Sequence, residues 1–412
     1  MKASEGVTAN HGLQQDGSAV NRGNRSIFSK VVHYLGGRVF RLIHQRLVKV
    51  YGQKPSAHRD RRIKRLTYWR NRMVLFLYHD EGRAERWTGF SAADGAPLKV
   101  AYLGNQRAYN EHSPEFLITR LFTEGQADRE DLGDCRPRDF INRAHALADG
   151  VDMVVIEQNR LTPFQARRGE WLRTDFEVRF IFEIKDDETW EDLRKRFKRQ
   201  KRNLSLIRRH GFTCRVASSP EEFDFFYDRM YIPMVQRRHS GYGKIEPRDI
   251  QFKYFQSGVL LQVLSPDNQP VSAGLLLPVN LVLFYTSNGL TDGSMEWFRR
   301  GALAALYYFS IQYGYENGFR ILDLGSTRPF LRDGIYTHKS QWDMQPVEDW
   351  RESNDWTFWV PAGSEAAFCW LRENLFDPRF ARWSGPTMEK IYTQADQRVQ
   401  KPEVWPVRAL TH

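Results

Sequence analysis

The chain has 412 residues, of which 41% are apolar, and this is enough material for two hydrophobic cores of ordinary size. Its 61 Lys and Arg exceed its 50 Asp and Glu, and the formal charge of +11 favours an anionic partner: nucleic acid, acidic lipid headgroups or a phosphate-bearing donor. Cys135, Cys214 and Cys369 lie far apart, which argues against a disulfide framework or a zinc ribbon and fits a reducing cytosol.

The first 25 residues are rich in Gly, Ser, Asn and Gln and are expected to be disordered. They contain no apolar h-region, so no signal peptide is expected. The longest apolar run, 273–285, falls short of the roughly 20 residues that a membrane-spanning helix needs. We therefore expect a cytoplasmic protein, with a peripheral position at the inner face of the membrane as an alternative.

A basic amphipathic helical segment is predicted over residues 26–65. Apolar residues recur at helical spacing from Ile27 to Val50, interrupted only by Gly36-Gly37, and Lys and Arg stand between them. Such a helix either packs its apolar face on the body of the protein or lies on an anionic membrane surface.

Residues 66–185 are predicted to form a first α/β domain, because strand patterns alternate there with a helical one. The expected strands and the helix lie, in chain order, at 73–78, 98–103, 140–147 (the helix), 151–156 and 176–184. No chemistry is predicted in this domain.

Residues 186–400 are predicted to form a second domain. Its first helix carries a run of cations from Arg194 to Arg209, and a capping box, Ser219 to Glu222, opens a second helix that ends near Arg238. A three-stranded antiparallel meander, a helix and a strand follow at 259–264, 271–277, 281–287, 300–317 and 319–324.

A basic turn, 297–301, leads into the helix that begins at Ala302. Gly301 lets backbone N–H groups point outward and the helix dipole adds partial positive charge, while Arg299 and Arg300 add two full charges. The turn is therefore predicted to bind the phosphates of coenzyme A or of another phosphate-bearing donor. A purely structural turn is the alternative.

Several of these features occur together in one known superfamily. They are the basic helix 194–209, Ala273-Gly274 and Tyr285 in the meander, the turn and helix 299–317, the run Phe319 to Ser326, then Gly334, His338-Lys339, Trp342 and the strand Trp356 to Val360. In this combination the chain resembles the GNAT superfamily of acyltransferases. Within it, the chain resembles the FemAB-like branch, which contains peptidoglycan-bridge aminoacyltransferases and acetyltransferase domains associated with cellulose biosynthesis.

The resemblance covers somewhat under half of the chain well. It implies an α/β (α+β) fold of tandem GNAT-like domains, each a mixed, mainly antiparallel sheet flanked by helices, with a degenerate first domain. It also implies an acyl donor as co-substrate and no permanently bound cofactor. The turn at Gly301 lacks the fuller glycine pattern of small coenzyme A-dependent acetyltransferases, so aminoacyl-tRNA stands beside acyl-coenzyme A as the donor.

Acyl transfer requires that the acceptor lose a proton, that the tetrahedral oxyanion be stabilised and that the donor be held. Three residues are predicted to be catalytic. Asp323 can orient or deprotonate an amine, Tyr285 can donate its hydroxyl to the oxyanion, and His239 titrates near neutral pH on a glycine-rich loop. The structural alternatives are a salt bridge to Lys339 or a cap of the turn at Gly325 for Asp323, packing for Tyr285 and a helix cap for His239.

Four residues are predicted to bind substrate: Ser326, Lys339, Tyr242 and Trp342. Lys339 resembles the family's lysine that faces a substrate phosphate or carboxylate, and a flexible ammonium suits that task. Trp342 can line an apolar acceptor pocket, although tryptophan more often fills a core.

The sequence thus predicts an acyltransferase that moves an acyl group from a thioester donor, acyl-coenzyme A, to an amine or hydroxyl of a small molecule, glycan or peptide. The alternatives are an aminoacyl-tRNA-dependent transferase and a non-catalytic protein that binds RNA or an anionic membrane surface through Arg194 to Arg209. Motifs of metalloproteases, serine hydrolases, P-loop and Rossmann proteins do not occur, and no metal site is predicted.

Overall fold

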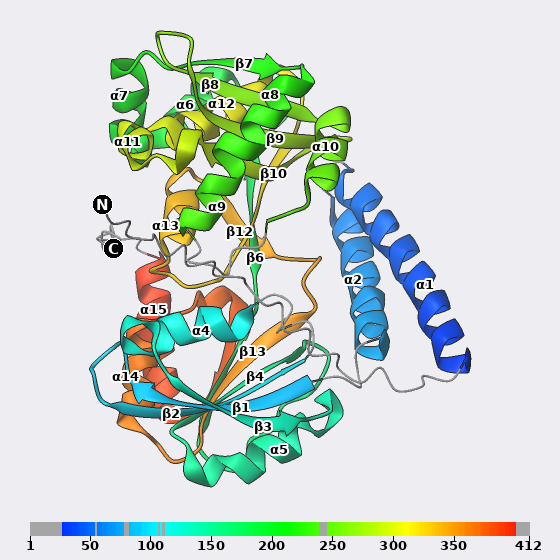
Figure 1. Ribbon diagram of the computed structural model, residues 1–412, viewed down its shortest axis with the longest axis vertical. Helices are drawn as coiled ribbons and strands as arrows, with labels where there is room; N and C mark the ends of the chain where they lie inside the picture. The colour runs from blue at the N-terminus through cyan, green and yellow to red at the C-terminus, as the bar shows by residue number, and fades with distance from the viewer. Residues whose placement is uncertain are drawn as a thin grey trace, which may run out of the picture.

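The computed structural model describes residues 27–53, 56–77, 82–105, 108, 112–238 and 245–400. It contains two seven-stranded sheets, in the lower and upper halves of Figure 1, and a helical hairpin along one side of the molecule. The predicted fold class, mixed and mainly antiparallel sheets flanked by helices, is confirmed. The segment 1–25, expected to be disordered, lies outside the described residues.

The first sheet has the strand order β14-β5-β13-β4-β2-β1-β3, and only β2 and β4 pair in parallel. Its strands are β1 (Gly82–Phe90), β2 (Pro97–Asn105), β3 (Asp128–Asp134), β4 (Met153–Asn159), β5 (Glu170–Asp175), β13 (Asn354–Val360) and β14 (Ala381–Ser384). The helices of this half are α4 (Ser113–Leu121), α5 (Phe140–Leu147), α14 (Glu365–Glu373) and α15 (Pro386–Gln400), with short turns η1 (Thr123–Gly125), η2 (Pro137–Asp139), η3 (Ala148–Gly150) and η7 (Pro378–Phe380).

The second sheet has the order β12-β6-β11-β10-β9-β8-β7, and only β10 and β11 pair in parallel. Its strands are β6 (Val178–Glu183), β7 (Thr213–Ala217), β8 (Val259–Leu264), β9 (Pro270–Val279), β10 (Val282–Leu290), β11 (Ile321–Thr327) and β12 (Gln345–Glu348). The helices of this half are α6 (Trp190–Arg196), η4 (Phe197–Gln200), α7 (Lys201–Arg209), α8 (Pro220–Phe225), the π-helical η5 (Phe226–Tyr231), α9 (Ile232–Arg238), α10 (Arg248–Ser257), η6 (Thr291–Gly293), α11 (Met295–Arg300), α12 (Ala302–Glu316) and α13 (Gly334–Gln341).

The two halves exchange strands. β6 follows β5 in the chain after two residues but lies in the second sheet, between β12 and β11. β13 returns from β12 to the first sheet and lies between β4 and β5. The expected boundary at residue 185/186 therefore does not separate the two sheets. β6 precedes this boundary but lies in the second sheet, and β13 follows it but lies in the first sheet.

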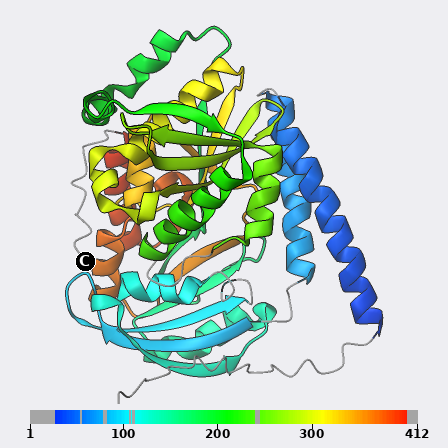
Figure 2. The ribbon, with the colours of Figure 1, turned by 45° about the horizontal axis from the view of Figure 1, so that its top comes forward.

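The hairpin consists of α1 (Ile27–Tyr51) and α2 (Ala57–Leu77), and it lies against the second sheet in Figures 1 and 2. Leu47 and Tyr51 pack on Val282, Phe284 and other residues of β10, β11 and β6. The expected amphipathic helix is thus present, with a core-facing side. No helix in the described part of the chain combines the length and apolarity that a membrane span requires.

Three local predictions were wrong. Residues 73–77 belong to α2 and not to a strand. The prediction failed because a short apolar run has no periodicity that distinguishes a helix from a strand. The basic helix 194–209 is broken into α6, η4 and α7. The basic turn 297–301 is largely the short helix α11, which ends where Gly301 takes a left-handed conformation.

Alternation along β10 assigns its side chains to two different cores. Leu283 and Tyr285 belong to the large core that includes α12, whereas Val282 and Phe284 pack with the hairpin. The same alternation applies to β11, where Leu322 faces the α12 side and Ile321 faces the hairpin. The second sheet therefore has an α12 face and a hairpin face.

Candidate active site

The parallel pairing of β10 and β11 is short. It covers three residue pairs, from Val282 opposite Ile321 to Phe284 opposite Asp323, and both strands then continue without pairing to each other. At this point each strand also breaks register with its other neighbour: β10 between Tyr285 and Ser287, and β11 between Asp323 and Ser326. The strands therefore separate, and backbone groups that a continuous ladder would have used are left between them.

An aromatic group lies on the α12 face beside this separation. The ring of Tyr285 stacks on Tyr307 of α12, with ring centroids 5.7 Å apart and planes at 8°. Tyr307 in turn meets the imidazole of His338 on α13 edge to face, at 5.0 Å. A Cβ on Gly274 would lie 2.9 Å from Tyr285 Oη, so the missing side chain on β9 makes room for this tyrosine. Tyr285 is buried, whereas His338 is half-buried.

Lys339 fixes the end of β11. Its Nζ donates to the carbonyl oxygens of Gly325, at 3.0 Å, and of Ser326, at 3.2 Å. Burial, together with the nearby Arg179 guanidinium, lowers the pKa of Lys339 to about 8. Ser326 and Lys339, both predicted to bind substrate, are thus brought together beside Tyr285. Lys339 is only 4% exposed, so its direct task in this conformation is to hold the strand end.

The predicted phosphate turn lies at the N-terminus of α12. Gly301 has φ +90°, and Ala302 starts a 15-residue helix whose first buried turns lead to Tyr307. Arg300 is exposed and pairs with Glu296 at 2.5 Å. Arg299 is exposed and has no ion pair among the described residues. The four predicted residues, which are consecutive in the sequence, lie where α11 ends and α12 begins, and phosphate binding there stays a prediction.

A basic surface lies next to this helix end. Leu206 of α7 would be 3.1 Å from a Cβ on Gly301, so α7 packs directly on the start of α12. Six exposed cations without ion pairs in the described structure follow η4 and α7: Lys198, Arg199, Lys201, Arg202, Arg208 and Arg209. We call these the α7 basic surface. In contrast, the first three cations of the predicted run, Arg194, Lys195 and Arg196, are each paired with a carboxylate.

Asp323 is separated from Tyr285 by the sheet. The carboxylate lies on the hairpin face, fully buried, and accepts two bonds from the Arg179 guanidinium, including one of 2.7 Å from Nε. The N–H of Gly325 donates to the same carboxylate at 3.1 Å. The salt bridge expected as its structural alternative is thus made, but with Arg179 instead of Lys339. This geometry gives Asp323 no access to a substrate beside Tyr285.

The remaining predicted residues divide into two groups. Trp342 is fully buried and packs on Phe197 and Tyr307, so in this conformation it is part of the core and not of a substrate pocket. His239 and Tyr242 lie outside the described residues.

Two functional candidates were missed as site residues in the sequence. His338 occurs in the His338-Lys339 pair but was not assigned a role, and only the fold brings it to Tyr307. Thr286 lies at the register break of β10, where its hydroxyl donates to Leu275 O at 2.9 Å. A β-bulge inside a predicted strand leaves no composition signal here, so the sequence could not locate it.

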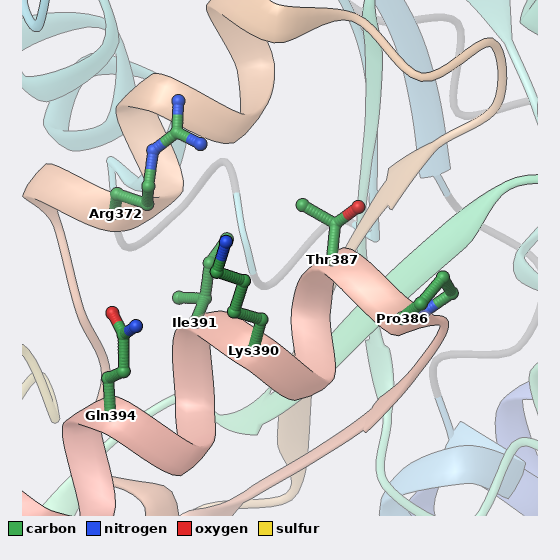
Figure 3. A pocket seen from close by; sticks show the side chains of 6 residues that line it. All are labelled: Arg372, Pro386, Thr387, Lys390, Ile391 and Gln394. Carbon is green, nitrogen blue, oxygen red and sulfur yellow. The ribbon is translucent and has the colours of Figure 1, made fainter.

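A surface pocket of about 430 Å³ lies elsewhere, on the first half of the molecule (Figure 3). It is lined by Arg372 of α14 and by Pro386, Thr387, Lys390, Ile391 and Gln394 of α15. Arg372 is engaged in an ion pair with Glu365, and no carboxylate lines the pocket to act as a base. In the part of the chain that the structure describes, no three His, Cys, Asp or Glu side chains are grouped as a metal site requires.

Comparison with known proteins gives only structural likenesses. No protein-family model and no curated protein matches the sequence. Among solved structures, the chain is similar to FemX at 11% identity, with 65% of this chain and 82% of that chain covered and a TM-score of 0.35. L-PGS from Bacillus licheniformis (12%, 71% and 89%, TM-score 0.29) and a GCN5-related N-acetyltransferase from Sphaerobacter thermophilus (12%, 67% and 81%, TM-score 0.28) are also similar.

All three likenesses are remote, with TM-scores between 0.28 and 0.35. At these identities the likeness concerns the fold alone, so the chemistry must be argued from this chain's own residues.

Proposed function

We propose that the chain is an acyltransferase whose reacting carbonyl lies between the separated ends of β10 and β11. The observation that carries this proposal is the loss of pairing after Phe284 and Asp323, on the face of the sheet where Tyr285 stacks on Tyr307 of α12 and Tyr307 contacts the half-buried His338. Such a gap exposes backbone N–H groups to a carbonyl oxygen, and the helix terminus favours the phosphates of the donor.

Each step of acyl transfer can be given to a residue on the α12 face. We assign to His338, which is half-buried and contacts Tyr307, the proton of the attacking amine or hydroxyl, because histidine is the side chain that most often acts as a general base. The Tyr285 hydroxyl and the N–H groups at the Thr286 bulge stabilise the tetrahedral oxyanion. Lys339 keeps the end of β11 in place through its bonds to two carbonyls.

The donor is acyl-coenzyme A in this proposal, with its phosphates at Gly301 and Arg299. The α7 basic surface supports a second candidate, an aminoacyl-tRNA. Its six exposed cations extend along η4 and α7 beside the helix end, which is more than the phosphates of coenzyme A require. Both donors offer an activated acyl carbonyl to the same gap, so only the carrier differs.

Binding experiments distinguish the donors. We expect acetyl- or longer acyl-coenzyme A to bind at moderate salt and to lose about tenfold in affinity in Arg299→Ala/Arg300→Ala, since each phosphate contact contributes on the order of 1 kcal/mol. The matched control is Arg136→Ala/Arg138→Ala, which removes two exposed arginines of the first half. Binding of bulk aminoacyl-tRNA that falls in Lys201→Ala/Arg202→Ala, without any coenzyme A binding, would favour the second donor.

Turnover tests the acyltransferase itself. With the donor that binds and a panel of amines and sugars, we expect His338→Gln to lower kcat by roughly 10²- to 10⁴-fold with donor affinity unchanged. Tyr285→Phe should lower it about 10²- to 10³-fold, as the loss of one oxyanion donor does. Equal activity of His338→Gln and the wild-type chain, at matched melting temperatures, would remove His338 from the mechanism. Absence of binding by every donor would refute the proposal as a whole.

A further inference from the structure

The positive charge of the molecule is concentrated in the hairpin. Residues 27–77 contain 13 Lys and Arg and one acidic residue, Asp60, a net charge of +12. The whole chain has a net charge of +11, so the remaining residues are close to neutral together. A basic hairpin on an otherwise neutral protein points to an anionic partner at this place rather than to a general property of the surface.

The side of the hairpin that faces away from the second sheet combines these cations with exposed apolar side chains. Four of the nine large hydrophobic residues found exposed in the described structure belong to it: Val39, Leu42, Tyr68 and Trp69, with exposed fractions of 44%, 64%, 45% and 49%. Exposed cations share their helical faces: Arg46 and Lys49 on α1, and Arg61, Arg65 and Arg72 on α2. We call these nine residues the outer face of the hairpin.

The cations of the outer face have no carboxylate partners in the described structure. The ion pair found within the described part of the hairpin joins Arg59 and Asp60, which are not part of the outer face. Arg72 instead donates to the hydroxyl of Tyr68 at 3.1 Å, and Tyr68 contacts Trp69 edge to face at 5.8 Å. Guanidinium groups and aromatic rings are therefore interleaved along α2.

The opposite side of the hairpin packs on the two sheets, so the orientation of the hairpin relative to the rest of the molecule is fixed. Leu47, Val50 and Tyr51 are buried, and Tyr51 packs on Trp350 with ring centroids 5.5 Å apart. At the other end of α2, Asn159 of β4 donates to Asn71 O at 3.1 Å. The hairpin thus contacts both halves and lies along one side of the molecule (Figures 1 and 2).

We propose that the outer face of the hairpin binds the surface of an anionic lipid bilayer. Arginine and lysine side chains meet the lipid phosphates, Trp69 and Tyr68 occupy the headgroup region, and Val39 and Leu42 reach the acyl boundary. The aliphatic pair favours a bilayer over RNA, because Val39 and Leu42 offer nothing to a phosphate backbone. This inference does not depend on the proposed acyl transfer.

The test is co-sedimentation of the purified full-length protein with vesicles. We expect binding to vesicles that contain phosphatidylglycerol in phosphatidylcholine and little binding to phosphatidylcholine alone. Arg61→Glu/Arg65→Glu should lower the partition coefficient at least about tenfold, since each basic residue near such a surface contributes about 1 kcal/mol. Leu42→Ser/Trp69→Ser should lower it about tenfold or more at unchanged charge.

Two controls match these variants. Arg136→Glu/Arg167→Glu makes the same change of charge on exposed arginines outside the hairpin, and Phe90→Ser removes a 61% exposed aromatic ring there. Both should bind vesicles like the wild type, with all variants checked for unchanged melting temperature. Equal loss in the charge control, or a hairpin variant that loses affinity for an RNA duplex while vesicle binding is unchanged, would overturn the proposal.

Discussion

The buried ion pair between Arg179 and Asp323 links three parts of the molecule at the scale of single residues. Arg179 comes from β6 and Asp323 from β11, and Asp349, after β12, lies 3.5 Å from the same guanidinium. On the hairpin side, the Tyr51 hydroxyl lies beside the Asp323 carboxylate, and burial together with that charge raises the pKa of Tyr51 well above its usual value. The cluster therefore fastens the hairpin and the exchanged strand to the back of the proposed site.

Loss of the cation from this cluster should be costly. Arg179→Met leaves two buried carboxylates without their common partner, and we expect the free energy of unfolding to fall by about 3–5 kcal/mol. Urea unfolding followed by circular dichroism measures this loss. The double variant Arg179→Met/Asp323→Leu should recover part of it, because it also removes a buried charge. A single variant as stable as the wild type would show that water reaches the cluster.

Glu157 of β4 should make stability depend on pH. Burial raises the pKa of this carboxyl to about 7, although Trp356 Nε1 donates to it at 2.8 Å. The unfolded carboxyl loses its proton near pH 4.5, so between that pH and 7 the folded state binds the extra proton and stability falls as the pH rises. In Glu157→Gln this fall should shrink by about 1–3 kcal/mol between about pH 5 and 8.

Thermal unfolding of the two proteins at both ends of this pH range provides the measurement. The control is Glu130→Gln, an exposed residue of β3 whose substitution should leave the pH profile unchanged. If Glu157→Gln kept the full pH dependence of the wild type, that pH dependence would have to come from another buried acid. Asp349 is such an acid, because burial also raises its pKa to about 7.

At the scale of elements, the sequence predicted what local patterns determine. The meander, the helix that becomes α12 and the capping box at Ser219 are all present, because alternation, helical spacing and a capping pair are properties of neighbouring residues. Errors arose where packing decides: the apolar run 73–77 is helical because it continues α2, and the basic run to Arg209 breaks after Arg196.

The arrangement of the site could be predicted only in part. Tyr285, Ser326 and Lys339 lie together, since the sequence order placed them at the ends of neighbouring elements. Asp323 was assigned to the same site because the sequence of a strand does not show which of its two faces meets the substrate. Its partner Arg179 was hidden as well, because β6 was expected to belong to the other domain.

At the scale of the whole molecule, the exchange of β6 and β13 makes each sheet depend on the other. β13 forms ladders with β4 and β5 near the centre of the first sheet, and β6 does so with β11 and β12 in the second. Two buried carboxylates mark the crossing from β12 to β13: Asp349, between the two strands, pairs with Arg179, and Asp355, at the start of β13, pairs with Arg173. If one half unfolded alone, the sheet of the other half would lose an inner strand.

We therefore expect the described body of the chain to unfold in one cooperative transition. Phe358→Ala removes a fully buried ring from β13 and should cost about 3–5 kcal/mol. Hydrogen exchange in urea, read by mass spectrometry, should then show the same loss of protection in β2 of the first sheet and in β9 of the second. Loss in β2 with β9 still protected would mean that the halves unfold separately and that the exchanged strands do not couple them. An equal loss in both would show that a change in one sheet is transmitted to the strands that border the proposed site.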